Sequence, residues 1–122
     1  MDNTLMAQNL DKFLAEVEWF SKLGLTSRGL RLLLNVYLNE GKRVSDYNRM
    51  VNEGETEERL ASLVGKTSGY FSNFERLGLV TKVPDETDVR GQAKKIYLTY
   101  KVKEALNKLL PILCEESENK LS

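Results

Sequence analysis

The sequence contains no histidine and only one cysteine, Cys114. Without histidine, imidazole acid–base catalysis and histidine-ligated metal sites are excluded. A single cysteine forms neither an intrachain disulfide nor a structural zinc site, and this usage is typical of a reducing compartment. No apolar run approaches the roughly 20 residues of a transmembrane helix, and the N-terminal residues do not resemble a signal peptide. The sequence therefore predicts a cytoplasmic protein without metal or cofactor.

Net charge is also absent, because 18 lysine and arginine residues balance 18 aspartate and glutamate residues. A neutral chain is not expected to bind nucleic acid indiscriminately. The charge is nevertheless distributed unevenly. Residues 66–101 contain seven basic and four acidic residues, which leaves an excess of three positive charges. Contacts with DNA phosphates, if the protein makes them, are expected in this part of the chain.

Residues 56–77 have the pattern of two helices joined by a tight turn. Thr56 is a favourable N-cap for the first helix, and Gly65 is a favourable residue to end it. Thr67 or Ser68 then caps a second helix that extends to the end of the segment. The sequence therefore predicts a helix-turn-helix here.

A predicted β-hairpin follows the second helix. Residues 79–83 have strand composition, and Pro84 ends the strand. After a charged loop, residues 95–99 alternate between apolar and polar side chains, as a returning strand does. A helix-turn-helix followed by a two-stranded wing is a winged helix. The predicted fold is thus mostly α-helical with a small β-wing (α+β).

The second predicted helix has a core face and a surface face. At about 100° per residue, the bulky side chains fall within one arc: Tyr70, Phe71, Phe74 and Leu77. The opposite arc carries small and polar residues, which allow the helix backbone to approach a duplex closely, and asparagine and arginine can bond base edges. A solvated helix face that binds nothing has a similar composition, so the wing that follows supports the DNA interpretation. The predicted DNA-binding residues are Lys66, Thr67, Ser68, Ser72, Asn73, Arg76, Arg90, Gln92, Lys94 and Lys95.

Two motifs resemble a known family. Residues 74–80, FERLGLV, look like the end of the recognition helix in MarR-like winged-helix transcription regulators. Residues 85–90, DETDVR, followed by IYLT at 96–99, are similar to the wing of that family. The sequence departs from the family pattern at Thr87, where the first wing arginine would stand, and at Gly69, where an arginine is common. The resemblance covers about two-thirds of the chain and implies a winged helix that binds DNA.

The two ends of the chain are predicted to be helices with surplus apolar surface. Residues 4–23 have one stripe of Leu10, Phe13, Leu14, Val17 and Phe20, and a second of Leu5, Trp19 and Leu23. A C-terminal stripe repeats at intervals of three and four residues: Val102, Leu106, Leu109, Leu110 and Leu113. A helix with two apolar sides usually packs against two partners. The sequence therefore predicts a homodimer formed by the terminal helices, or else an N-terminal helix sandwiched within the monomer.

The whole chain is predicted to be a single winged-helix domain, divided into an N-terminal helix (1–24), a winged-helix core (26–100) and a C-terminal helix and tail (101–122). Residues 42–55 exceed the length that a minimal winged helix needs. They are predicted to form either a short helix over 45–51 or a loop. Their basic residues are offset by acidic ones, so no site is assigned there.

The predicted function is sequence-specific binding of double-stranded DNA by a homodimeric transcriptional regulator. No enzymatic activity is expected, because paired carboxylates such as Glu57 and Glu58 lie at solvated positions. The alternative is a winged helix that docks other proteins in replication or DNA partition. The zero net charge favours the alternative, whereas Asn73, Arg76 and the basic strand residues favour DNA.

Overall fold

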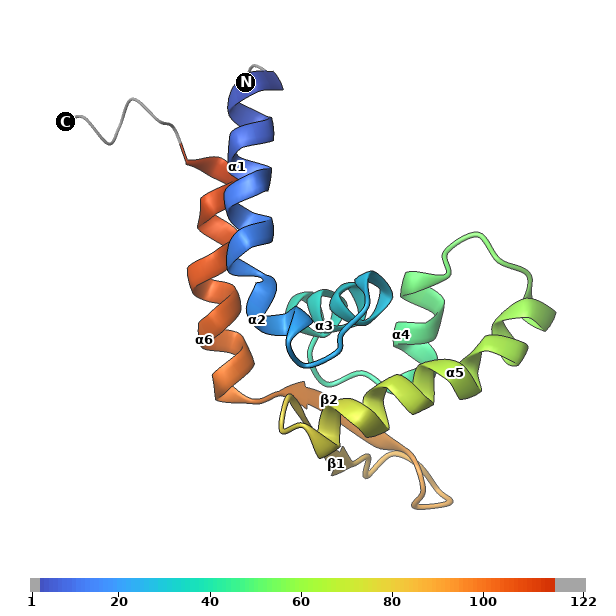
Figure 1. The fold of residues 1–122 in the computed structure, drawn as a ribbon. Coiled ribbons are helices and arrows are strands. Elements are labelled where there is room, and N and C mark those ends of the chain that lie inside the picture. The colour runs from blue at the N-terminus through green and yellow to red at the C-terminus, as the bar shows by residue number, and fades with distance from the viewer. Residues whose placement is uncertain (1–2, 116–122) are drawn as a thin grey trace.

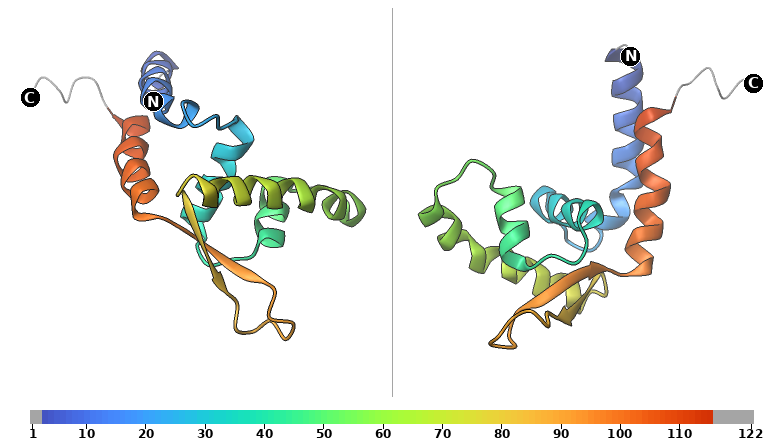
Figure 2. Two further views of the ribbon diagram at one scale, coloured as in Figure 1. Left: turned by 60° about the horizontal axis from the view of Figure 1, so that its bottom comes forward. Right: turned by 180° about the vertical axis from the view of Figure 1, so that it is seen from behind.

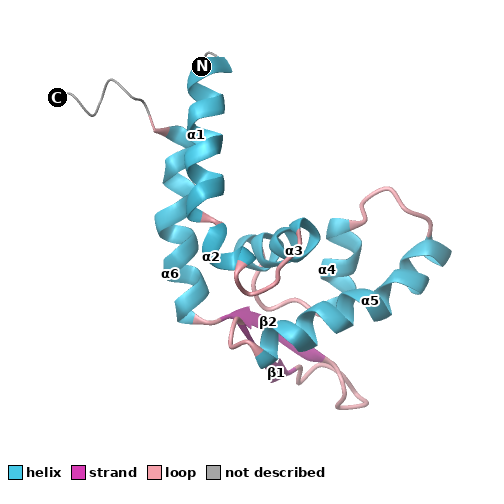
Figure 3. Ribbon diagram, viewed as in Figure 1, coloured by secondary structure: helices cyan, strands magenta, loops and turns pink. Residues whose placement is uncertain are grey.

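The computed structural model describes residues 3–115, apart from the side chain of Trp19. The predicted tail after residue 115 lies outside these residues. The elements are α1 (Asn3–Glu16), α2 (Glu18–Ser21), α3 (Ser27–Leu38), α4 (Val44–Val51), α5 (Glu57–Arg76), β1 (Val80–Pro84), β2 (Lys94–Leu98), α6 (Tyr100–Leu109) and the 3₁₀ helix η1 (Leu110–Cys114). Figure 3 shows that the structure is mostly helical with one small sheet, as the sequence predicts. Within residues 3–115, no helix has the length and apolar character to cross a membrane.

The molecule has two parts, a winged-helix body and a pair of terminal helices. Helix α1 lies beside the α6–η1 segment, and this pair stands away from the body (Figure 1). The wing loop between β1 and β2 points away from the helix pair in every view (Figure 2). The body therefore presents α5 and the wing at a surface that is remote from the chain ends.

The core lies between α3, α5 and the sheet. Phe71 and Phe74 of α5 are fully buried, with their rings edge to face at a centroid distance of 5.6 Å. Tyr70 and Leu77 pack against the same cluster, so the predicted core face of this helix is confirmed. Full burial of one such aromatic side chain contributes about 1.5–3 kcal/mol. This packing determines which side of α5 faces outward.

The predicted boundaries of the helix-turn-helix are wrong. Helix α5 runs without interruption from Glu57 to Arg76, and Gly65 lies within it rather than ending it. Thr56 caps this helix as predicted, because its side chain accepts a hydrogen bond from the Arg59 amide at 3.1 Å. Good capping and apolar packing outweigh the cost of a glycine in the helix interior, about 1 kcal/mol. The segment is one long helix of about 30 Å.

The preceding helix of the motif is α4, which lies within the segment that was predicted to be extra length. Of the two predicted alternatives, the structure contains the helix, Val44–Val51. Its burial explains why: Tyr47 is fully buried, and its ring lies 5.5 Å from that of Phe71. Helix α4 therefore packs directly on α5, and the two form the helix-turn-helix with a longer connection than the sequence suggested.

The wing begins at a sharp turn after α5. Gly78 has a φ of +75°, a conformation that favours glycine, and the Leu79 amide bonds the Phe74 carbonyl at 2.8 Å to close the helix end. Strands β1 and β2 then pair antiparallel, from Val80 opposite Leu98 to Pro84 opposite Lys94. The predicted strands are confirmed to within one residue. A single bridge between Lys42 and Ile96 attaches the segment before α4 to the same sheet.

The terminal helices are partly covered by their own chain. Phe13, Val17 and Phe20 are buried, but Leu10 and Leu14 of the same predicted stripe are 50% and 57% exposed. The C-terminal residues Val102, Leu106 and Leu109 are buried within the monomer rather than left for a partner. The amide of Asn9 joins the two segments by donating to the Glu115 carbonyl at 2.7 Å. Of the predicted stripes, most of the apolar surface that stays open is thus on α1, while Leu113 in η1 is 38% exposed.

Candidate nucleic-acid interface

The middle of the outermost ridge of α5, within residues 62–72, consists of small residues. Four exposed residues there lie opposite the buried Phe71 and Phe74: Ser62, Gly65, Gly69 and Ser72. The charged residues Glu58 and Arg76 continue the ridge toward its two ends. A Cβ atom added at either glycine would have no neighbour within 4 Å, and neither glycine has a positive φ. Neither packing nor backbone conformation therefore requires glycine at these positions. The ridge allows another molecule to approach the helix backbone closely.

Most of the predicted binding residues on α5 lie on this ridge or beside it. Lys66, Ser68, Ser72 and Arg76 are exposed, and Asn73 is half-buried. The side-chain oxygen of Asn73 accepts a hydrogen bond from Arg76, so the two side chains act as a unit at the C-terminal end of the helix. An asparagine that is held by an arginine has less freedom to bond a base edge alone.

Thr67 does not lie on this surface, contrary to the prediction. Its side chain is buried, and its hydroxyl donates to the Asn48 side-chain oxygen at 2.8 Å. Thr67 was predicted to be at the surface because the second helix was predicted to begin at Thr67 or Ser68. In the continuous helix, residue 67 lies on the same side as Phe71 and Phe74 and faces α4.

Asn48 is the centre of a buried polar network that joins three helices. Its amide nitrogen donates to the Leu60 carbonyl at 2.9 Å, and its oxygen also accepts from Asn52 at 3.0 Å. Asn52 in turn accepts from the Arg28 guanidinium of α3 at 2.9 Å. All buried side-chain polar atoms of residues 3–115 have a partner. The network holds α3, α4 and α5 in one arrangement, which sets the direction of the α5 ridge.

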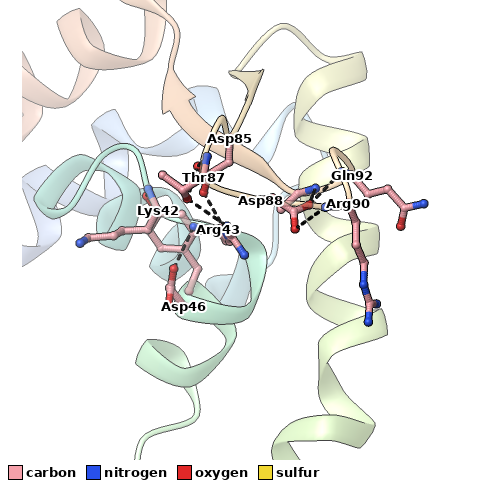
Figure 4. Close-up of polar contacts among 10 residues, drawn as sticks. Lys42, Arg43, Asp46, Asp85, Thr87, Asp88, Arg90 and Gln92 are labelled. Carbon is pink, nitrogen blue, oxygen red and sulfur yellow. Dashed lines mark hydrogen bonds and ion pairs between the residues drawn. The ribbon is translucent and has the colours of Figure 1, made fainter.

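The base of the wing is anchored to α4 by an ion pair (Figure 4). The Arg43 guanidinium donates to the Asp85 carboxylate at 2.7 Å, and Asp85 is only 7% exposed. The same carboxylate accepts from the Thr87 hydroxyl at 2.7 Å and the Thr87 amide at 3.0 Å. The Thr87 hydroxyl and the Arg43 guanidinium together hold the pKa of Asp85 well below its ordinary value. The carboxylate is therefore ionised and fully engaged at neutral pH.

The tip of the wing is organised by Asp88. Its carboxylate accepts backbone hydrogen bonds from Ala93 at 2.7 Å, Gln92 at 2.9 Å and Arg90 at 3.4 Å. These bonds, with that from Ala93 strongest, lower the pKa of Asp88. The side chains of Arg90 and Gln92 extend away from the Arg43–Asp85 contact (Figure 4). Asp88 thus shapes the loop through its backbone and leaves both predicted side chains free to meet a partner.

A hollow of about 350 Å³ separates the wing from the helix-turn-helix. We name it the wing hollow, and its lining includes Arg43, Ser45, Ser68, Lys82, Gln92 and Lys94. Lys94 lies on the same strand face as the buried Ile96, whereas Lys95 lies on the opposite face, as their adjacent positions predict. The sequence did not assign Arg43 and Ser45 to a site. Their basic and hydroxyl character was visible, but their place beside the wing depends on the fold.

A second hollow, of about 170 Å³, lies on the other flank of α5. We name it the α3–α5 hollow, and it is lined by Arg28, Asn52, Glu55, Arg59, Leu63, Lys66 and Thr67. Of its three basic residues, only Lys66 was predicted as a binding residue. Arg28 and Arg59 belong to segments that the sequence left without a site, and no local motif marks them.

Comparison with known proteins supports the fold. No protein-family model and no curated protein matches the chain. Among solved structures, S. aureus MepR in complex with DNA has a TM-score of 0.65 at 21% identity, over 95% of this chain and 82% of MepR. Transcriptional regulator Tm0710 from Thermotoga maritima has a TM-score of 0.61 at 20% identity, over 87% of this chain. A MarR-family transcriptional regulator from Silicibacter pomeroyi has a TM-score of 0.55 at 18% identity, over 90% of this chain and 67% of that protein.

The chain therefore has the winged-helix fold that MarR-family transcription regulators share, which confirms the resemblance seen in the sequence. It spans 64% of the length of the Thermotoga protein, less than two thirds.

Proposed function

We propose that this protein is a cytoplasmic, homodimeric transcriptional regulator that binds double-stranded DNA in a sequence-specific manner, and that it is not an enzyme. The observation that carries the proposal is the ridge of small residues along α5, with the wing beside it. Two exposed glycines in a helix interior reduce helix stability without a structural benefit, which indicates a close contact with a partner. The similar fold of MepR, whose structure contains DNA, supports DNA as that partner.

Helix α5 is proposed to enter the major groove of the duplex, which is about 12 Å wide and admits one helix. Ser68, Ser72 and the Asn73–Arg76 unit would then face base edges or the nearest phosphates. In the wing, Arg90 and Gln92 would reach the backbone or the adjacent minor groove, and Lys94 would face phosphates from the wing hollow.

The homodimer is proposed to form through α1. Met6, Leu10 and Leu14 recur at intervals of four residues, and each is at least 50% exposed. Two copies that bury this stripe against each other would be related by a twofold axis. Each copy would then place one α5 helix on one half of a palindromic site.

The proposal is tested with two variants that place a larger side chain at position 69, Gly69→Ala and Gly69→Leu. Gly69→Ala is expected to stabilise the fold by up to about 1 kcal/mol, because alanine favours the helix and nothing obstructs its Cβ. The same change is expected to weaken binding to a duplex selected from a random library, and Gly69→Leu to weaken it roughly tenfold or more. Thermal melting and fluorescence anisotropy measure the two effects.

The opposite signs distinguish the proposed function from a purely structural role. If Gly69 were needed for packing, its replacement would lower both the stability of the protein and its affinity for DNA. If the wild-type protein selects no duplex, or if Gly69→Leu binds the selected duplex as tightly as wild type, then the ridge is not a DNA contact. Either outcome would favour the alternative of a winged helix that docks another protein.

A further inference from the structure

The α3–α5 hollow collects positive charge that the protein does not neutralise. Arg28, Arg59 and Lys66 line it, and Glu55 is its only acidic residue. Among the residues that the structure describes, the Arg59 guanidinium and the Lys66 ammonium have no hydrogen-bond or ion-pair partner. Two other cations of the body are paired: Arg43 with Asp85, and Arg49 with Glu57 at 2.8 Å.

The third cation is held in place by the buried network. Arg28 donates to Asn52 at 2.9 Å, and Asn52 is bonded to Asn48 in the core. The guanidinium is thus fixed beside the hollow rather than free to move into solvent. Gathering cations around one polar hollow raises their mutual repulsion, and an anion in the hollow would relieve it.

The two hollows lie on opposite flanks of α5. Lys66 lines the α3–α5 hollow and Ser68 lines the wing hollow, and residues two apart are separated by about 200° around a helix. A helix in the major groove has one phosphate backbone on each side. The two hollows therefore match the two strands that border the groove.

We propose that the α3–α5 hollow binds a phosphate group, and that this group belongs to the DNA strand on the side of α5 away from the wing. This inference rests on the proposed DNA-binding function. Arg59 and Lys66 supply the charge, and Arg28 supplies an oriented guanidinium, which matches phosphate oxygens. Glu55 opposes the phosphate and weakens its binding. The wing hollow holds the other strand, so α5 is seated between two phosphate contacts.

The test uses the full chain, with Arg59→Gln and Lys66→Gln combined, and a duplex selected by the wild-type protein. One lost phosphate contact is expected to flatten the slope of log affinity against log salt by about 0.9 and to leave the preferred sequence unchanged. The control is Lys22→Gln combined with Lys108→Gln, which removes the same charge outside the hollow and should change the slope little. Melting curves verify that each variant is folded.

Glu55 provides a second, opposite test. Glu55→Gln is expected to increase DNA affinity several-fold, because it removes the only acid in the hollow. Glu53→Gln removes the same charge from the same loop but not from the lining of the hollow, so a smaller increase is expected. Equal increases would show only a general charge effect and would contradict the proposal.

A third measurement identifies the source of the phosphate. Inorganic phosphate is added to the DNA-free protein at constant ionic strength, and the melting temperature is recorded. If phosphate stabilises the wild type but not the double variant, and the DNA salt slope is unchanged, the hollow binds a free phosphate and the DNA assignment is overturned. If neither quantity changes although wild type binds its duplex, the phosphate site is refuted while the proposed function stands. If wild type binds no duplex, the proposed function itself fails.

Discussion

Asn48 is a buried polar residue at the contact between α4 and α5. Burying an amide costs free energy unless its donors and acceptors are satisfied, and here both the oxygen and the nitrogen have partners. The partners come from α5, through Thr67 and the Leu60 carbonyl. An apolar residue of similar size would tolerate small rotations between α4 and α5, whereas these directional bonds allow one orientation. Asn48 thus contributes to the orientation of the α5 ridge as well as to the stability of the protein.

Replacing Asn48 by alanine is expected to lower the free energy of unfolding by about 1–3 kcal/mol, because the Thr67 hydroxyl and the Asn52 amide lose a buried acceptor. Urea denaturation measures the change. Asn35→Ala is the matched control: the Asn35 amide bonds only the Arg31 carbonyl in its own helix, at an exposed position. Equal losses for the two variants would show that the network has no special role.

The wing is an element whose base is held by contacts with other elements. Strands β1 and β2 alone form a two-stranded hairpin, which is marginally stable in isolation. Arg43, at the start of α4, joins the base of this hairpin through Asp85, and the Lys42–Ile96 bridge adds a backbone contact. Helix α4, to which both are attached, therefore contributes to the angle between the wing and α5.

Asp85→Asn tests this positioning role. The change removes a negative charge near the proposed DNA surface, so electrostatics alone predicts tighter DNA binding. We expect the reverse, a loss of roughly tenfold, because the neutral amide binds the Arg43 guanidinium more weakly and the base of the wing is held less firmly. Fluorescence anisotropy with the selected duplex measures the effect.

Glu86→Gln is the control for this prediction, since it removes an exposed charge from the neighbouring position. It is expected to leave affinity unchanged or to increase it. If Asp85→Asn behaves like Glu86→Gln while both proteins melt as wild type does, the ion pair does not position the wing for binding.

At the scale of the whole molecule, the open apolar stripe on α1 lies away from the proposed DNA-binding surface. The α1–α6 pair stands on the side of the body opposite the wing loop (Figure 1). A twofold contact through Met6, Leu10 and Leu14 would therefore leave both α5 helices uncovered. Leu106, which the sequence offered as an interface residue, is fully buried, so a charge there would unfold the monomer.

The double variant Leu10→Glu and Leu14→Glu is expected to be a folded monomer at micromolar concentration. Burying the exposed part of each leucine contributes about 1 kcal/mol, and the twofold axis doubles the loss. Sedimentation velocity measures the association state and circular dichroism the fold. Leu38→Glu is the control, because Leu38 is 72% exposed at the end of α3 and lies outside the proposed interface. A monomeric wild-type protein would contradict the dimer.

The sequence by itself determined the two faces of α5 and the two strands of the wing. Helical periodicity separates Phe71 and Phe74 from Ser68, Ser72 and Arg76, and this separation does not depend on where the helix begins. The turn at Gly78 and the alternation before Thr99 are likewise properties of short segments. Such local patterns predicted the fold class, and seven of the ten predicted binding residues are exposed, whereas Asn73 and Lys95 are half-buried and Thr67 is buried.

 

Only the tertiary structure decided where the helix-turn-helix begins and what surrounds it. Gly65 has the local character of a helix end, but the Thr56 cap and the burial of Leu60 and Thr67 outweigh its cost of about 1 kcal/mol. The Arg43–Asp85 pair joins residues 42 positions apart, and both hollows are lined by side chains from separate elements. A local pattern carries no information on such contacts, because they arise from how the elements pack. For that reason the sequence predicted the surface of α5, and the structure determined what flanks it.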